Sequence, residues 1–202
     1  MITKLDFPVI DKDRHIEKIT PGQDIIVTGF IALEGTARLA AEQRERVLRT
    51  LPEELLDDAA GFLEYLNRVP EAAVAIQHGA TAMLTVGDGG IMTALWELAG
   101  YSGTGMRVNL RDISVKQETI EICEVLELNP YHLLSGGCAL MTADNGYRLC
   151  ETLRGMGFAA RVIGHTTTDN DKAIINGDSL GFLNRPQTDE YIRFSSVKSR
   201  EN

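Results

Sequence analysis

Cysteine is scarce in this sequence, and its spacing argues against both a disulfide framework and a zinc site. The residues Cys123, Cys138 and Cys150 are odd in number and widely separated. None belongs to a Cys-x-x-Cys pair or lies at zinc-finger spacing from a histidine. Because unpaired cysteines are among the most buried residue types, we expect three reduced thiols in or near a core, and a cytoplasmic location.

Long apolar runs and excess positive charge are also lacking. No stretch approaches the ~20 apolar residues that a membrane span requires, and residues 1–7 contain no apolar run of signal-peptide length. The formal net charge of -9 would repel nucleic acid and anionic membranes at long range, so we expect neither as a partner. A local basic pocket could still hold a phosphate, because net charge does not describe a site of a few residues.

Histidine offers no catalytic constellation. The four histidines are His15, His78, His132 and His165, and none lies beside a serine or cysteine in a recognisable nucleophile context. We therefore predict structural roles for them, and we predict no catalytic residue and no metal ligand from the residue pattern itself.

The composition that is present, 44% hydrophobic and 24% charged over 202 residues, is typical of one globular domain. Residues 1–23 are polar, contain two prolines and are expected to form an irregular N-terminal extension. The domain itself is expected over residues 24–192, and residues 193–202 are expected to form a polar tail.

Strand-like and helix-like segments alternate along the domain. A β-branched run from Asp24 predicts a buried strand, and a helix is expected after residues 34–36, up to about Arg49. Residues 81–86 and 91–101 predict a strand followed by a helix. Asn176-Gly177 between two short apolar runs predicts a terminal hairpin. The hairpin and the short spacings favour a mixed α/β sheet with helices mainly on one face.

Two strand–turn–helix junctions could bind an anion. They span residues 28–36 and 85–90, and in each a glycine allows close backbone approach while the following helix offers free N–H groups. Asp88 could cap its helix or ligate Mg²⁺ through an oxygen. By themselves, however, both junctions are better explained as glycine turns with capping residues. A third glycine pair, at 136–137, is explained as well by the end of a helix as by a binding role.

Ten residues from these segments are the candidate ligand-binding residues. They are Thr28, Glu34, Gly35, Thr36, Asp88, Gly89, Gly90, Ser135, Gly136 and Gly137. If the cleft assignment is right, a bulky residue in place of Gly90 should weaken anion binding with little loss of fold.

The order of short blocks along residues 20–192 resembles the C-terminal half of the aminoimidazole ribonucleotide (AIR) synthetase-related, hydrogenase-maturation-factor-like superfamily. No single block is diagnostic, and the resemblance rests on their common order. The blocks are residues 27–37 (VTGFIALEGTA), 69–73, 78–79, 89–99 (GGIMTALWELA), 117–123, 129–131, 160–164 and 188–190.

The resemblance implies a two-half architecture. Full-length members have an N-terminal half that dimerises and supplies most ATP and Mg²⁺ ligands, and an α/β C-terminal half that closes over the site and helps to hold phosphate or substrate. By resemblance, ATP and Mg²⁺ are the implied cofactors, and residues 34–36 and 88–90 would line the cleft.

Three departures from the family pattern bear on activity. The N-terminal half is missing from this sequence, and residues 1–23 cannot replace it. Relatives tend to carry His-Asp where this chain has Leu84-Thr85, which removes a titratable pair. The hydrogenase-maturation dehydratase ends in a reactive cysteine, whereas this sequence ends in Asn202, so we expect that cyanide-ligand synthesis is not open to this chain alone.

Two hypotheses remain open. In the first, the chain is a non-catalytic module for phosphate or nucleotide binding or for assembly, with a homodimer as one form. In the second, it is half of a split ATP-dependent synthetase or hydrogenase-maturation-type enzyme that a separate N-terminal partner completes. Either way, we expect no activity from the chain alone and a small phosphorylated ligand as its partner. A thiol-based metal or redox site is a third reading, which the cysteine spacing does not favour.

Overall fold

A mixed eight-stranded sheet forms the centre of the part of the chain that the computed structural model describes, residues 14–66 and 70–201. Its strand order is β1-β3-β5-β2-β6-β4-β7-β8, and all neighbours are antiparallel except the β4–β7 pair. The strands are β1 (Arg14–Ile16), β2 (Asp24–Thr28), β3 (Ala80–Thr85), β4 (Gly105–Asn109), β5 (Ala139–Ala143), β6 (Ala160–Thr167), β7 (Lys172–Asn176) and β8 (Ser179–Phe182).

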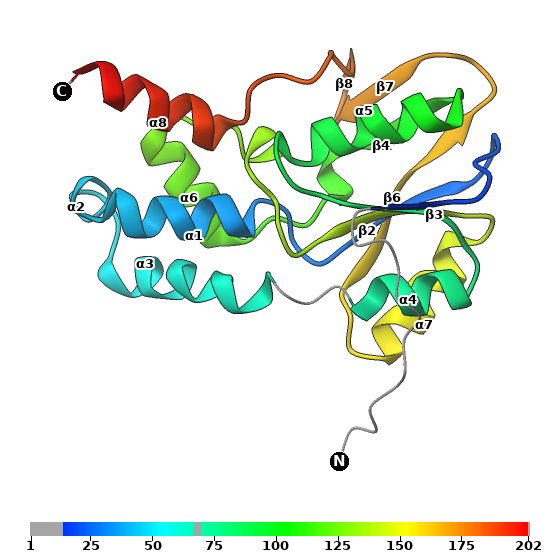
Figure 1. Cartoon of the computed structure of the whole chain (residues 1–202), viewed down its shortest axis with the longest axis horizontal. Helices are drawn as coiled ribbons and strands as arrows, with labels where there is room; N and C mark the ends of the chain where they lie inside the picture. The colour runs from blue at the N-terminus through cyan, green and yellow to red at the C-terminus, as the bar shows by residue number, and fades with distance from the viewer. Residues whose placement is uncertain (1–13, 67–69, 202) are drawn as a thin grey trace.

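Helices cover both faces of this sheet and extend beyond one end of it (Figure 1). Helix α5 lies on one face, α4 and α7 lie on the other, and α1, α3, α6 and α8 form a group past the sheet end. The helices are α1 (Leu33–Glu42), α2 (Arg44–Val47), α3 (Glu53–Ala60), α4 (Pro70–Gln77), α5 (Gly90–Ser102), α6 (Gln117–Leu126), α7 (Gly146–Gly155) and α8 (Glu190–Glu201), with 3-10 turns η1 (Gly61–Tyr65), η2 (Leu110–Asp112) and η3 (Pro130–His132).

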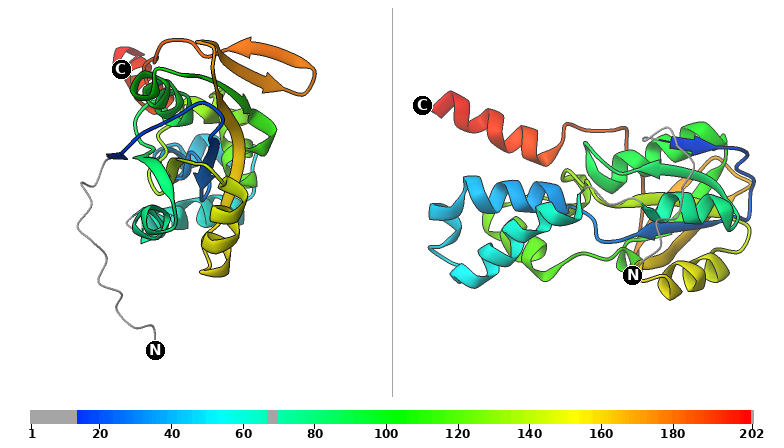
Figure 2. Two further views of the ribbon diagram at one scale, coloured as in Figure 1. Left: turned by 90° about the vertical axis from the view of Figure 1, so that its right-hand side faces the viewer. Right: turned by 60° about the horizontal axis from the view of Figure 1, so that its bottom comes forward.

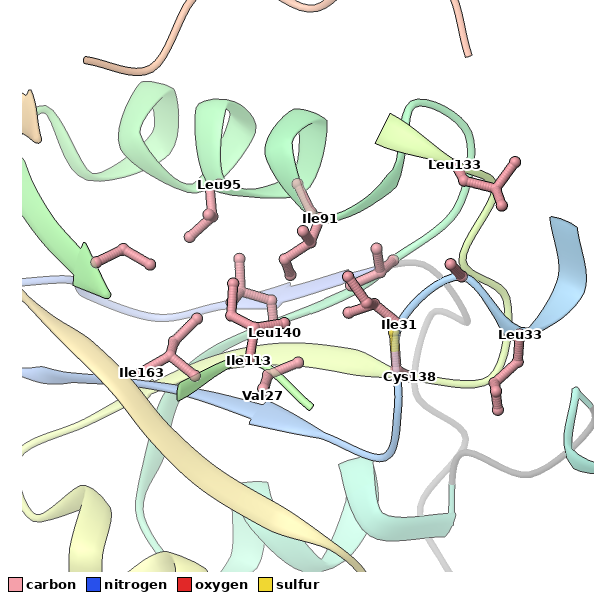
Figure 3. Packing of buried hydrophobic residues seen from close by; sticks show 14 of the residues in the cluster. Val27, Ile31, Leu33, Ile91, Leu95, Ile113, Leu133, Cys138, Leu140 and Ile163 are labelled. Atoms are coloured by element: carbon pink, nitrogen blue, oxygen red, sulfur yellow. The ribbon is translucent and has the colours of Figure 1, made fainter. Parts of the chain in front are cut away.

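Strand β2 divides the interior into two hydrophobic clusters. Because successive side chains of a strand point to opposite faces, Ile25 and Val27 join the larger cluster under α5, while Ile26 joins the smaller one against α4 and α7. Figure 3 shows Ile91 and Leu95 of α5 pointing toward the sheet residues of the larger cluster. The alternation of β-branched residues in β2 therefore ties both helical layers to one central strand.

The mixed α/β class and the terminal hairpin are confirmed. In the hairpin, however, Asn176 pairs with Ser179, so the two loop residues are Gly177 and Asp178. Gly177 has a φ of 61°, whereas Asn176 does not have a positive φ. Glycine at the first loop position provides the positive φ that the turn needs, so the turn is centred on Gly177-Asp178, one residue later than the Asn176-Gly177 pair that predicted it.

Four expectations about the fold were wrong. The helix expected up to Arg49 breaks at Gln43, whose backbone (φ -111°, ψ 15°) leaves the helical region, so α1 and α2 are separate. The segment 1–23 is not wholly irregular, because β1 pairs with β3. The helices do not lie mainly on one face, because α5 covers one face of the sheet and α4 and α7 cover the other. The polar segment expected over residues 193–202 continues α8 as far as Glu201, and Figure 2 shows α8 as a long helix leading to the C-terminus. The domain boundaries themselves stay a prediction.

Some expectations concern residues outside the described part. Most of the extension expected over residues 1–23, namely residues 1–13, lies outside the described residues, and so does residue 69, the first residue of the 69–73 block. Among the described helices, none combines the length and apolar character needed to cross a membrane. All three cysteines are buried, as the composition predicted, and burial raises the pKa of the Cys123 thiol to about 12.

Candidate functional site

The candidate residues lie in three loops that meet at one end of the sheet. Strand β5 runs antiparallel to both β2 and β3, with Val27 opposite Leu140 and Thr85 opposite Ala139. The start of β5 therefore lies beside the ends of β2 and β3. This pairing brings segments 28–36, 85–90 and 133–138 together.

Backbone hydrogen bonds hold these loops against one another. The Ala32 N–H donates to Ser135 Oγ at 2.7 Å, and the Gly35 N–H donates to the Leu134 carbonyl at 2.9 Å. The Ser135 N–H in turn donates to the Gly87 carbonyl at 3.2 Å. The buried hydroxyl of Ser135 thus acts as a link between the loops.

A pocket of about 380 Å³ opens where these loops meet the start of α8, and we call it the carboxylate pocket. Of the ten candidates, Glu34, Asp88 and Gly136 line it. Arg38, Asp189 and Tyr191 line it as well, although the sequence pattern assigned them no role. The complete lining is Glu34, Arg38, Val86, Gly87, Asp88, Leu134, Gly136, Asp189, Tyr191 and Ile192.

The Glu34–Arg38 ion pair spans one turn of α1 at the pocket wall. The Arg38 guanidinium donates to Glu34 Oε1 at 2.6 Å, and this hydrogen bond raises the pKa of Arg38. A Cβ atom on Gly136 would lie 2.2 Å from Glu34 Oε2, so glycine leaves the space that this carboxylate occupies. The four-residue spacing of Glu34 and Arg38 is a signal that could have identified Arg38 from sequence.

Tyr191 connects α8 to this wall. Its hydroxyl donates to Glu42 Oε1 at 2.6 Å, and that hydrogen bond raises the pKa of Tyr191. The Arg38 guanidinium carbon lies 5.6 Å from the centre of the Tyr191 ring, within the range of a cation–π contact. Tyr191 thus fixes the rim of the carboxylate pocket from a segment far away in sequence.

Asp189 already occupies the N-terminus of α5. This carboxylate is 4% exposed and accepts the Gly89 N–H at 2.6 Å and the Tyr191 N–H at 2.8 Å. Desolvation raises the pKa of Asp189, while the backbone hydrogen bonds act in the opposite direction. An anion bound at a helix N-terminus is favourable, and here the protein supplies that anion itself. The Gly89 N–H is therefore engaged within the protein.

Gly90 and Gly35 serve close packing. Gly90 has a φ of 64°, and a Cβ there would lie 2.5 Å from the Tyr131 carbonyl oxygen and 2.8 Å from that of Leu133. A Cβ on Gly35 would lie 2.5 Å from Leu133 Cγ. The expectation that a bulky residue at position 90 spares the fold is therefore wrong, because backbone atoms fill the space it needs.

Thr28, Thr36 and Gly137 complete the framework behind the pocket. Thr28 Oγ1 accepts the Ala139 N–H at 3.1 Å, and the buried Thr36 hydroxyl donates to the Ala32 carbonyl at 2.7 Å. Gly137 has a φ of 91°, which favours glycine at this turn. Both threonine hydroxyls thus stabilise the loops through hydrogen bonds to the backbone.

The donor set of the carboxylate pocket suits Mg²⁺ only as a companion of a phosphate ligand. Within residues 14–66 and 70–201, no group of three or more Asp, Glu, His or Cys side chains could hold a metal ion. Mg²⁺ is commonly bound through one or two carboxylates together with substrate phosphates. Glu34 and the exposed Asp88 could supply those carboxylates, with ATP or a similar ligand supplying the rest.

The sequence matches that of known proteins over most of its length. The model of the family described as AIR synthase related protein, C-terminal domain, matches residues 20–176. A hydrogenase expression/formation protein of Methanocaldococcus jannaschii is 26% identical over 87% of this chain and 52% of its own length. Carbamoyl dehydratase HypE of Azotobacter vinelandii is 33% identical over 86% of this chain and 50% of its own length. The chain thus spans about half the length of these relatives.

Solved structures show the same fold. Escherichia coli HypE, a hydrogenase maturation protein, superposes with a TM-score of 0.67 at 18% identity, covering 89% of this chain and 55% of HypE. A HypE structure in complex with ATP gives a TM-score of 0.64 at 16% identity, covering 91% of this chain and 56% of that protein. These folds agree with the match of the family model. We conclude that the chain belongs to the family of AIR synthase related proteins and corresponds to their C-terminal domain.

Proposed function

We propose that this chain is the ligand-binding C-terminal half of an AIR synthase-related system, and that it binds a small phosphorylated ligand without catalysing a reaction alone. The observation that carries the proposal is the carboxylate pocket, where Glu34 and Asp88 face one cavity of about 380 Å³. Two carboxylates beside glycine-rich backbone suit a Mg²⁺-carried phosphate such as that of ATP.

The noncatalytic part of the proposal rests on the state of the pocket side chains. The Glu34 carboxylate is held by Arg38, and the Asp189 carboxylate is held by two backbone N–H groups. A general acid or base must exchange protons freely near working pH, and groups engaged in this way are better suited to positioning than to proton transfer. Leu84 and Thr85 offer no titratable pair beside them.

A second candidate is half of a split, HypE-like, ATP-dependent enzyme. It is favoured by the fact that HypE relatives match this chain over only about half of their own length. In this case a separate N-terminal half would supply the remaining ligands for ATP and Mg²⁺. A homodimer of this chain is the assembly expected of the non-catalytic candidate.

Thermal unfolding of the purified chain with and without Mg-ATP, Mg-ADP and phosphate tests the binding proposal. A ligand at ~100 times its dissociation constant adds about 2.7 kcal/mol to the free energy of unfolding, which raises the melting temperature by several degrees. Glu34→Gln should abolish the Mg-nucleotide shift. The matched variant Glu54→Gln, on exposed α3 surface, should retain it. An unchanged shift in Glu34→Gln would place the ligand elsewhere.

Complementation separates the two candidates. The chain is mixed with the separately produced N-terminal half of a HypE relative, and ATP hydrolysis is measured against each part alone. Hydrolysis that appears only in the mixture, and disappears with Glu34→Gln, supports the split enzyme. A nucleotide-dependent shift without hydrolysis in the mixture supports the non-catalytic module.

A further inference from the structure

A second cavity, with a volume of about 420 Å³, lies where β2 ends, β6 begins and α7 finishes its last turn. We call it the arginine pocket, after Arg154 and Arg161 in its wall. It has no lining residue in common with the carboxylate pocket. The complete lining is Val27, Gly29, Ser114, Arg154, Ala159, Ala160 and Arg161.

The charge of the arginine pocket is opposite to that of the chain. Both arginines are exposed, no acidic residue belongs to the lining, and neither arginine joins an ion pair with another described residue. Lys116 follows Ser114 by two positions, and its ammonium nitrogen lies 4.6 Å from the centre of the ring of Phe30, the residue after Gly29. On a chain of net charge -9, such a local concentration of cations needs an explanation.

Part of this site is already positioned. The Arg154 Nε donates to the Ala160 carbonyl at 2.9 Å, which orients the guanidinium and leaves its two terminal nitrogens for another acceptor. Arg161 lies on β6 opposite Val27, so its backbone is held by the sheet. Ser114 is held through its carbonyl, which accepts the Ile31 N–H at 3.1 Å. The three lining residues that could contact an anion are thus held in place around one cavity, Arg154 through its side chain and the other two through their backbone.

A structural role explains only part of the arrangement. Arg154 stands in the last turn of α7, where a cation is favoured by the helix dipole. Arg161 is on a strand, and no such argument applies to it. A cavity of this size is in the range of small-molecule sites, and forked guanidinium groups match the oxygens of phosphate.

We propose that the arginine pocket binds a small phosphate-type dianion, with Arg154 and Arg161 as the charged ligands and the Ser114 hydroxyl as a further donor. The site is separate from the carboxylate pocket and does not depend on the function proposed for it. The dianion is either free phosphate or the phosphate end of a nucleotide, and both present the same oxygens to the two guanidinium groups.

Calorimetric titration of the full chain with inorganic phosphate, and separately with AMP in the absence of Mg²⁺, tests this proposal. Arg154→Gln and Arg161→Gln should each weaken binding by about tenfold or more, as expected for hydrogen bonds to a charged group. Arg148→Gln removes the same charge from exposed α7 surface outside the pocket and should change the affinity by less than about twofold. Tighter binding of AMP than of phosphate would identify a nucleotide as the source.

Three results would overturn the proposal. They are no binding of either probe to the unaltered chain, full affinity in both pocket variants, and an equal loss in Arg148→Gln, which would indicate only general charge attraction. Glu34→Gln separates the two pockets, because it should leave phosphate binding at the arginine pocket unchanged. A loss of this binding in Glu34→Gln is a fourth result against the proposal, because it would assign the anion to the carboxylate pocket. Because both arginines are exposed, thermal unfolding should confirm that the variants remain folded.

Discussion

The two pockets are built in different ways. The carboxylate pocket is made by loops that are hydrogen-bonded to one another, and its buried Asp189 caps α5. The arginine pocket presents exposed side chains from a helix end and a strand that would hold their shape without them. Substitution of the packed residues of the first should therefore change the stability of the whole domain, whereas removal of the exposed Arg161 side chain from the second should change mainly what binds there.

This difference explains why glycine matters more in one pocket than in the other. Gly90 and Gly136 of the first region leave space for a backbone carbonyl and for the Glu34 carboxylate, respectively. Gly29 at the second has a φ of 68°, but a Cβ there would approach no atom closer than 3.3 Å. A side chain at Gly90 or Gly136 would therefore meet closer contacts than one at Gly29, where the positive φ also favours glycine.

The largest expected effect is that of Gly90→Val. The substitution combines a strained positive φ with overlap on the Tyr131 and Leu133 carbonyls, so we expect a loss of about 3–5 kcal/mol in the free energy of unfolding. Urea unfolding measures it. The control Gly155→Ala lies in α7 with open space around it and should be neutral or stabilising by up to about 1 kcal/mol. Equal stabilities of the two variants would show that the carbonyls of residues 131 and 133 move aside at little cost.

Asp189→Ala should have the next largest effect. It leaves the Gly89 and Tyr191 N–H groups without their acceptor, which should lower the free energy of unfolding by about 2 kcal/mol. Asp58→Ala, at an exposed position of α3, is the control and should change it by less than about 0.5 kcal/mol. If Asp189→Ala lowers the free energy of unfolding no more than this control does, water replaces the Asp189 carboxylate as acceptor without loss of stability.

The pH dependence of the Asp189 contribution sharpens the same point. Desolvation raises the pKa of Asp189 in the folded chain. The carboxyl group of Asp189 therefore binds a proton more tightly in the folded state than in the unfolded state. As the pH rises from about 4, the ordinary pKa of aspartate, through the raised folded pKa, stability from this group is lost. The stability of the unaltered chain minus that of Asp189→Asn should therefore fall over this range. A rise would show that the hydrogen bonds outweigh desolvation.

The smallest expected effects are those of single charge removals at the pocket surfaces. Glu34→Gln breaks a half-exposed ion pair with Arg38 and should cost about 0.2–1 kcal/mol. Arg161→Gln should change the free energy of unfolding by less than about 0.5 kcal/mol, because the side chain is exposed and joins no ion pair among the described residues. Urea unfolding of both variants in one buffer compares them. A larger loss in Arg161→Gln would show that the arginine pocket also supports the fold.

Much of the fold follows from local patterns. The β-branched run at Ile25–Val27 predicted a buried strand, and the Gly89-Gly90 turn after the β3 run predicted the start of a helix. The same approach failed for β1 and α8, whose short or polar sequences carry little periodicity. Strand β1 forms by pairing with β3, and α8 contacts α1 through Tyr191 and Glu42 and contacts α2 through Phe194 and Arg46. Such contacts depend on residues more than 60 positions away.

The candidate site shows the same limit. Local glycine and acidic patterns identified Glu34, Asp88 and Gly136, and the i, i+4 spacing could have added Arg38. Asp189 belongs to the 188–190 block of the resemblance, but nothing in that block indicated that it caps α5. Arg154 and Arg161 are separated from Ser114 by about 40 residues of chain or more. No spacing rule relates positions that different strands and helices bring together.

The sequence by itself determined the class of the fold, the burial of the cysteines, the family and the glycine-rich loops, because these depend on local composition, periodicity and the order of short segments. The tertiary structure alone decided that Asp189 fills the N-terminus of α5, that Gly90 is needed for packing and that two arginines share one cavity. Each of these depends on strand order and helix docking. The free energy of burying distant apolar residues together determines both.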